Sequence, residues 1–234
     1  MATVTATGYT YQQYIDDVVS EEVTVCKYVR QAVQRHLDDL ERVGSPDFPY
    51  YFDHDEARRA IDFIQRLHHV DWSWTNRRAH PDPRIRLEPW QQFQEAMIYG
   101  WRRVADGCRR FSLAYIEIAR KNGKTTLGWV NGLYCFLADS PRSEGGQCYC
   151  IATKKDQAMY AWKPARLACE THPVLKKYTK VYRQGNTITV PGTLGVFKPL
   201  GRDSDSEDGA AAHFTLVDEY HAHKTRYLID VMRD

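Results

Sequence analysis

Long hydrophobic runs are absent from this sequence of 234 residues. No stretch approaches the roughly 20 apolar residues that a membrane-spanning helix needs, so the sequence offers no candidate span. Residues 1–10 also lack the charged and apolar pattern of a secretion signal, and we therefore expect the protein in the cytosol. No repeat with a period of roughly 20–50 residues is present, which argues against a repeat architecture.

An excess of one charge sign is also absent, since the formal net charge is only +2. Bulk charge therefore does not make the chain a polyanion binder, although local patches stay possible. The six cysteines include no C-x-x-C pair, and several lie in apolar runs. We expect reduced, mostly buried thiols rather than zinc ligands or disulfides. Apolar content of 43% is ordinary for a globular protein of one large domain, or of a domain with an appendage.

Two patterns follow one another along the chain. Up to about residue 86, apolar residues recur at helical spacing, as at Val29, Val33 and Leu40. From Pro89 onward, strand-like and helix-like segments alternate, which is typical of an α/β sheet. We expect a helix from Pro89 that Gly107 ends, strands at 111–118, 147–153, 194–198 and 214–217, helices at 124–137 and 156–170, and a hairpin at 182–189. The sequence thus predicts a helical N-terminal extension over residues 1–86 and a core with a mostly parallel sheet over 87–234.

A basic, glycine-containing turn lies between the expected strand 111–118 and the expected helix 124–137. Backbone N–H groups at such a turn can hold anionic oxygens, and Gly123 lets the backbone come close. Lys124 could reach the β- and γ-phosphates of a nucleotide, and the hydroxyl of Thr125 could bind Mg²⁺. The phosphate-loop consensus has a glycine where Ile118 stands, so a solvated basic turn is the alternative.

An acidic pair follows the apolar run Phe214–Val217. In open α/β sheets, ligands bind at the carboxyl ends of strands. Asp218 would there hold Mg²⁺, and Glu219 would orient water or take its proton. Alone, the pair is equally compatible with two exposed acids that end a strand. The order and spacing of the basic turn and the acidic pair together favour a nucleotide triphosphatase site.

Further candidates are weaker. Arg120 could stabilise charge on the γ-phosphate, and the Gln91 carboxamide could pair with an adenine edge. The pairs Arg102–Arg103 and Arg109–Arg110 could contact nucleic acid, although solvated surface is the simpler interpretation. His221 and His223 follow the acidic pair, without further residues at a zinc-binding spacing.

Together these residues resemble the N-terminal ATPase region of the large terminase subunit of tailed bacteriophages. Five stretches carry the resemblance: Arg35–Leu40, Leu87–Gln91, Ala119–Thr125, Ala152–Ala158, and Asp208–Gly209 with Leu216–His221. In this family a loop arginine is usual and the first glycine of the phosphate loop is often missing, which accounts for Ile118. The resemblance implies a P-loop NTPase fold of the additional-strand, catalytic-glutamate class.

The resemblance also implies an activity and partners. ATP would be hydrolysed with Mg²⁺ to drive double-stranded DNA into procapsids, in a homo-oligomeric ring on the portal protein with a small terminase subunit. The protein would act in the host cytoplasm without a membrane. Catalysis would depend on Glu219 and Arg120, and the metal would contact Thr125 and Asp218. The residues expected to bind ATP are Gln91, Arg120, Lys121, Asn122, Gly123, Lys124, Thr125 and Thr126.

The family's coupling motif and nuclease domain have no counterpart before Asp234, so we expect no nuclease activity in this chain. Two alternatives remain. One is a helicase-like ATPase that depends on nucleic acid, and the other is a nucleotide-binding assembly module that does not hydrolyse.

Overall fold

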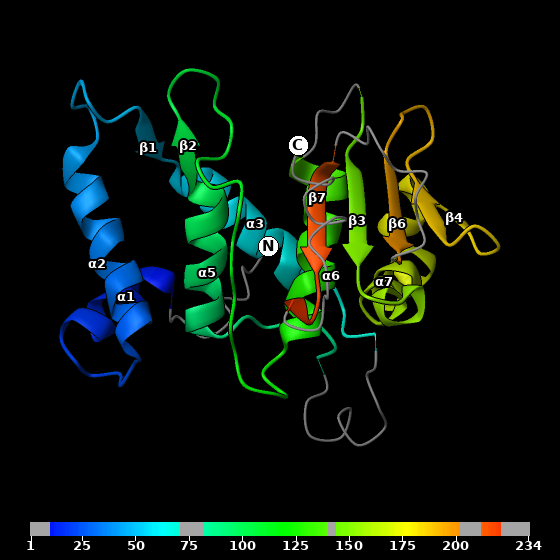
Figure 1. The fold of residues 1–234 in the computed structure, drawn as a ribbon, viewed down its shortest axis with the longest axis horizontal. Coiled ribbons are helices and arrows are strands. Elements are labelled where there is room, and N and C mark those ends of the chain that lie inside the picture. Colours follow the sequence, from blue (N-terminus) through cyan, green and yellow to red (C-terminus); the bar gives the residue numbers. More distant parts are fainter. Residues whose placement is uncertain (1–9, 71–81, 140–143, 202–211, 221–234) are drawn as a thin grey trace. The chain divides into compact units, whose positions relative to one another are not determined.

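The computed structural model describes residues 10–70, 82–139, 144–201 and 212–220. The chain divides into two compact units. The first, here called the N-terminal unit, contains residues 1–66 and 84–117, and the second, the sheet unit, contains residues 67–83 and 118–234. Residues 87–117 thus group with the preceding helices in this division by contacts. The division does not test where domains begin and end, so the domain boundary expected between residues 86 and 87 stays a prediction. Figure 1 shows the elements of both units in chain order.

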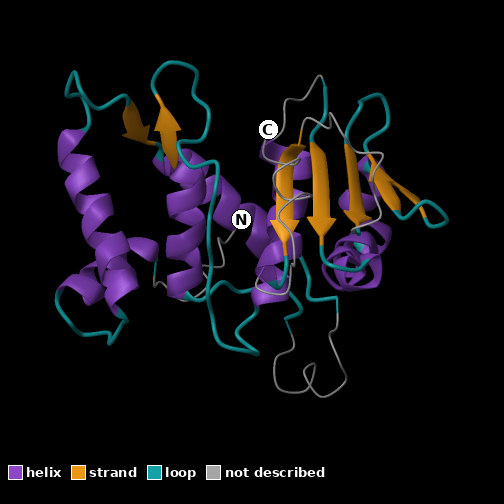
Figure 2. Ribbon diagram, in the orientation of Figure 1, coloured by secondary structure: helices purple, strands orange, loops and turns teal. Residues whose placement is uncertain are grey.

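Helices dominate the N-terminal unit, with one small two-stranded sheet (Figure 2). Its elements are α1 (Tyr11–Val19), α2 (Lys27–Arg42), β1 (Tyr50–Phe52), α3 (His54–Arg66), α5 (Pro89–Gly100) and β2 (Trp101–Arg103). The carboxylate of Asp53 accepts hydrogen bonds from the backbone N–H groups of Asp55 and Glu56 and so caps α3. Ala57 and Ile64 are fully buried on the face of α3 that packs on α5.

The helix that begins at Pro89 is shorter than the sequence suggested. Its apolar stripe predicted continuation to Gly107, but α5 ends at Gly100 and the chain enters β2. A Cβ atom on Gly100 would lie only 2.5 Å from the ring of Phe52, so the glycine lets β1 pack closely here. Phe52 pairs with Trp101 across the antiparallel β1–β2 ladder. Trp101 is therefore buried in the core as predicted by its apolar character, but it belongs to β2 and not to the helix.

The central sheet is mixed, which corrects the predicted mostly parallel sheet. Its order is β4-β5-β6-β3-β7. The strands are β3 (Gln147–Ile151), β4 (Lys180–Tyr182), β5 (Thr187–Thr189), β6 (Val196–Leu200) and β7 (Ala212–Val217). β6, β3 and β7 run parallel, whereas β4, β5 and β6 pair antiparallel. Chain connections explain this, because the predicted hairpin at Gly185–Asn186 and the short link from β5 to β6 leave no room for a crossover.

Helices α6 (Lys124–Tyr134) and α7 (Lys155–Thr171) pack on the sheet and on each other. Figure 1 shows both on the same side of the strands. α6 lies very close to the sheet, because a Cβ on Gly128 would come within 2.7 Å of Leu216 and one on Gly132 within 2.6 Å of Phe197. The indole of Trp162 on α7 donates a 2.9 Å hydrogen bond to the carbonyl of Phe197. A π-helix, η1 (Cys135–Asp139), continues α6, and a short helix, α8 (Leu175–Tyr178), follows α7.

β7 carries an irregularity near its start. Gln147 of β3 lies opposite Ala212, but the next residue, Cys148, lies opposite Phe214. His213 is therefore an extra residue of the β-bulge type. In a regular strand successive side chains alternate between the two faces, so Ala212 and Val217 would lie on opposite faces. Because of the extra residue, both pack on the same buried cluster, which Tyr149, Ile151 and Leu200 form.

The segment 111–118 was predicted to be a strand, and this is wrong. It contains no strand in the structure, and Leu113 and Tyr115 are 67% and 73% exposed. A strand requires a hydrogen-bonded neighbour, and no strand within the described ranges pairs with these residues. Apolar and β-branched composition suggested the strand but could not supply its partner.

The prediction of mostly buried thiols is confirmed. All six thiols lie within the described residues and none forms a disulfide. Cys135, Cys148, Cys150 and Cys169 are buried, and burial raises the pKa of Cys169 to about 12. Among the described residues, no helix combines the length and apolar character needed to cross a bilayer.

Candidate functional site

The basic turn before α6 adopts a tightly wound backbone. Lys121 and Gly123 have positive φ angles of 67° and 81°. The side-chain amide of Asn122 donates to the carbonyls of Ala119 and Arg120, each at 3.2 Å, and so fastens the turn. Gly123 is the N-cap of α6 and provides no capping side chain. The backbone N–H groups in the first turn of α6 therefore point out of the N-terminal end of this helix, where the helix dipole favours an anion.

The acidic pair lies at the carboxyl end of β7, as predicted. The N–H of Asp218 still bonds to the carbonyl of Ile151, at 3.3 Å, and so extends the β3–β7 ladder by one residue. Glu219 then turns away with a φ of 51°, an uncommon conformation for a residue with a side chain. Its N–H bonds to Asp218 Oδ1 at 3.0 Å, which supports the turn. The side chain of Asp218 is 22% exposed and that of Glu219 is 53% exposed.

The structure brings the basic turn and the acidic pair together. Lys124 Nζ lies 3.3 Å from Asp218 Oδ1 and donates a hydrogen bond to Glu219 Oε1, although Lys124 and Glu219 are 95 residues apart in sequence. The hydrogen bond to Glu219 and the charge of Asp218 raise the pKa of Lys124. Since all three side chains reach solvent, the contact is screened, and it forms an accessible site rather than a buried core pair.

The other loop residues surround this contact. Thr125 and Thr126 are half-buried in the first turn of α6, whereas Arg120, Lys121 and Asn122 are exposed. The direct contacts of Lys124 with both acids were not predicted from the sequence. No local signal could have shown them, because they depend on how α6 and β7 pack.

Gln91 lies in the N-terminal unit and caps α5. Its side-chain oxygen accepts a 2.9 Å hydrogen bond from the N–H of Glu88, and the two residues form a capping box. Its predicted contact with adenine stays a prediction. Asp208–Gly209, which carries part of the resemblance, and both His221 and His223 lie outside the described residues.

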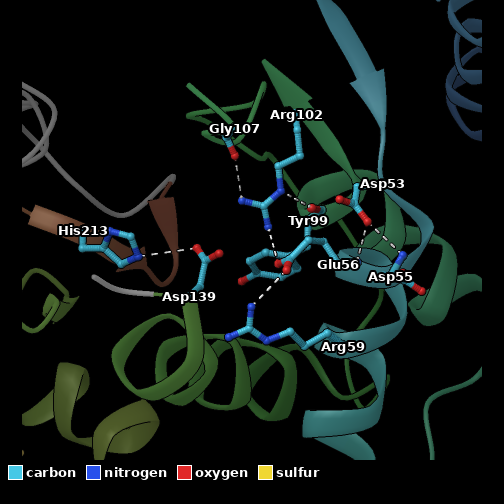
Figure 3. A network of polar contacts seen from close by, with 9 residues as sticks. All are labelled: Asp53, Asp55, Glu56, Arg59, Tyr99, Arg102, Gly107, Asp139 and His213. Carbon is cyan, nitrogen blue, oxygen red and sulfur yellow. Dashed lines mark hydrogen bonds and ion pairs between the residues drawn. The ribbon is translucent and has the colours of Figure 1, made fainter. Parts of the chain in front are cut away.

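Two arginines proposed above as nucleic-acid contacts have structural partners instead. Arg102 donates to Glu56 at 2.8 Å and to the carbonyl of Tyr99 at 2.9 Å (Figure 3). Arg110 donates to Asp39 at 2.6 Å. Both side chains are thus used within the N-terminal unit, so these arginine pairs do not form a basic surface as a whole.

Residues 89–234 match the family model described as the ATPase domain of the terminase large subunit. The fold is similar to the crystal structure of the HK97 bacteriophage large terminase, with a TM-score of 0.60 and 21% sequence identity over 75% of this chain. The aligned part spans only 34% of that terminase. A search of the curated proteins finds no match.

The family model covers well over half of the chain and includes the basic turn and the acidic pair. It confirms the predicted relationship to the ATPase region of the phage DNA-packaging motor. The chain belongs to the ATPase-domain family of terminase large subunits.

Proposed function

We propose that this chain binds and hydrolyses ATP with Mg²⁺ and that the hydrolysis drives double-stranded DNA into a phage procapsid. The observation that carries the proposal is the approach of Lys124 to both Asp218 and Glu219. A phosphate-binding lysine, a metal-binding acid and a catalytic base must all lie within reach of one triphosphate. The three side chains meet this requirement although they come from different elements.

The phosphates would bind at the start of α6. The N–H groups of its first turn and the ammonium group of Lys124 are the positive partners. Arg120 is exposed in the same turn, from which its guanidinium would stabilise charge that develops on the transferred phosphate. Lys121, Asn122 and Thr126 would complete the loop around the triphosphate.

The residues present fit a magnesium ion. Mg²⁺ prefers hard oxygen ligands, and Asp218 and Thr125 supply a carboxylate and a hydroxyl. The acids also hold a cation in this structure, because the Lys124 ammonium contacts both of them. A bound Mg²⁺ would neutralise phosphate charge during hydrolysis. Asp218, fixed by the ladder to β3, would keep the metal at the carboxyl edge of the sheet.

Glu219 would act as the general base. In the structure its carboxylate is engaged by Lys124 and cannot at the same time be fully available to water. When Lys124 turns to the phosphates, it releases Glu219, which can then orient a water molecule and take its proton. The same lysine would therefore bind substrate and make the base available.

Three further parts of the proposal depend on the family relationship rather than on contacts within this chain. They are the additional-strand, catalytic-glutamate class of the fold, the contact of Gln91 with adenine, and work in a homo-oligomeric ring on the portal with a small terminase subunit in the host cytoplasm. The present chain spans about a third of the HK97 terminase that it resembles. DNA translocation would therefore be the activity of the whole motor.

Calorimetric titration of Mg·ATP tests the proposal. We expect the wild type to bind and Lys124→Ala to lose binding, since the substitution removes the cation that holds the phosphates. Lys176→Ala is the matched control, because Lys176 is an exposed lysine of α8 that the site does not use. Absence of binding by the folded wild type, or equal binding by Lys124→Ala, would overturn the proposal.

A further inference from the structure

A second group of side chains with ligand atoms lies elsewhere in the sheet unit. The sulfur of Cys135, a carboxylate oxygen of Asp139 and a ring nitrogen of His213 all lie within 4.8 Å of one another. Nε2 of His213 is 3.4 Å from Oδ2 of Asp139 (Figure 3). Cys135 is fully buried, the side chain of Asp139 is 5% exposed, and that of His213 is 24% exposed. The group is thus an enclosed cluster, in which Nε2 of His213 is itself buried.

Two backbone irregularities create this cluster. Cys135 and Asp139 are the first and last residues of the π-helix η1, a rare form that often marks functional positions. His213 is the extra residue in β7 where the register with β3 shifts, and such bulges redirect a side chain. Regular continuation of α6 and β7 would place these side chains differently. Two independent departures from regular structure therefore converge on the same three ligand atoms.

We propose that Cys135, Asp139 and His213 bind a Zn²⁺ ion, with water as the fourth ligand. Thiolate, imidazole and carboxylate are the ligands that zinc takes in proteins, at roughly 2.0–2.3 Å and in tetrahedral geometry. Ligand atoms on such an ion are roughly 3.3–3.7 Å apart, and the 3.4 Å between His213 and Asp139 falls in this range. Binding displaces the proton of the Cys135 thiol to solvent.

The zinc site is chemically distinct from the proposed magnesium site. Asp218 and Thr125 offer only oxygen atoms, which suit Mg²⁺, whereas the sulfur of Cys135 favours a softer ion. The two sites lie at opposite ends of the same elements. α6 begins at Lys124 and continues through η1 to Asp139, and β7 runs from His213 at its start to Asp218 just beyond its end. The zinc ion therefore joins α6–η1 to β7 at the ends remote from the nucleotide.

Spectroscopic titration of the chelator-treated chain with Co²⁺ tests the proposal without any nucleotide. Co²⁺ replaces Zn²⁺ in tetrahedral sites, and its bond to a thiolate gives an absorption band that oxygen ligands cannot give. We expect one thiolate-bound Co²⁺ per chain, displaced by Zn²⁺, and a rise in melting temperature when Zn²⁺ is added, because an ion that binds only the folded state stabilises it.

Variants assign the ligands. Cys135→Ser should abolish the thiolate band. His213→Gln and Asp139→Asn should each weaken Co²⁺ binding at least about tenfold, because even the loss of a residue that only supports a metal ligand lowers metal affinity by about that factor. His213→Gln matters most if Cys135→Ser does not fold, because His213 is partly exposed. Cys108→Ser is the matched control, since Cys108 is an exposed thiol of the other unit. A folded wild type without the band, or a band that persists in Cys135→Ser or resists His213→Gln, would overturn the proposal.

Discussion

At the scale of single residues, Lys124 connects the two halves of the nucleotide site. It bonds to Glu219 and approaches Asp218. A charged lysine next to two carboxylates keeps the site compact, while its exposure keeps the attraction weak enough to exchange for phosphate. The lysine and the two acids are therefore already close together, but their contact is weak enough for Lys124 to move to a phosphate.

Glu219→Gln should leave Mg·ATP binding intact and abolish turnover. The amide keeps the size of the side chain but cannot take a proton, so we expect a loss of at least about 10²-fold in the hydrolysis rate. Phosphate release measures the rate, and calorimetry measures binding. Glu144→Gln, at an exposed acid of the same unit, should leave both unchanged. Turnover that survives in Glu219→Gln would remove this residue from the mechanism.

His36 should make the stability of the protein depend on pH. Its Nδ1 accepts a hydrogen bond from the indole of Trp101 at 3.1 Å, which requires that this nitrogen carries no proton. Burial, and secondarily the charge of His54, lower the pKa of His36 from 6.5 to about 4. Because the unfolded state then binds the proton more tightly, the contribution of His36 is complete above about pH 6.5 and is lost as the pH falls to about 4.

The expected loss is about 1.4 kcal/mol in the free energy of unfolding per pH unit within that window. Denaturant unfolding at several pH values measures it. His36→Phe, which cannot titrate, should show a shallower pH dependence than the wild type, and identical slopes would contradict the assignment.

At the scale of elements, the contact of α6 with the sheet positions Lys124. Gly128 and Gly132 bring the helix so close that Leu216 and Phe197 fill the space where a Cβ would lie. Leu216 precedes the acidic pair by two residues. The packing thus fixes the distance between the lysine and the acids.

Gly128→Ala should destabilise the protein. A better helix propensity contributes up to about 1 kcal/mol, but overpacking against Leu216 costs about 1–3 kcal/mol, so the net effect is a loss of stability. Thermal unfolding measures it. In the background of Leu216→Ala, where the space is open, Gly128→Ala should no longer destabilise. Additive effects of the two substitutions would show that the contact is absent.

In the N-terminal unit, Arg102 joins α3 to β2. Its side chain is 9% exposed and pairs with Glu56. Arg102→Ala should cost about 3 kcal/mol of unfolding free energy, because it removes one partner from a largely buried ion pair. The neighbouring Arg103→Ala is the control and should cost at most about 1 kcal/mol, since the pair of Arg103 with Asp106 is exposed. Equal losses in denaturant unfolding would refute the structural role of Arg102.

At the scale of the whole molecule, features that depend on short stretches of sequence could be predicted, and features that depend on contacts between distant stretches could not. Lys124, Asp218 and Glu219 could be proposed because a glycine turn and a strand end are short-range signals. The missing partner of residues 111–118 could not be predicted, since strand pairing is decided by distant parts of the chain. The same holds for the antiparallel strands and for the meeting of Cys135 with His213, which depends on two local irregularities.

Double-stranded DNA should stimulate ATP turnover more than single-stranded DNA does. The reason is that a packaging motor acts on duplex, whereas a helicase-like ATPase responds to the separated strand. Phosphate release at matched nucleotide concentrations and fixed salt measures the difference, because binding to the DNA backbone depends strongly on salt. Stronger stimulation by single strands would favour the helicase-like alternative.

The extra residue at His213 also determines where β7 can change in length during evolution. A deletion or insertion of one residue between Phe214 and Val217 would reverse the faces of the residues before it or after it, and with them either the apolar contacts or the direction of Asp218 and Glu219. Loss of His213 itself would instead leave a regular ladder, with Ala212 and Phe214 opposite the same partners as before. Position 213 is thus the place in this strand where homologues could differ in length and still keep their acids facing the lysine.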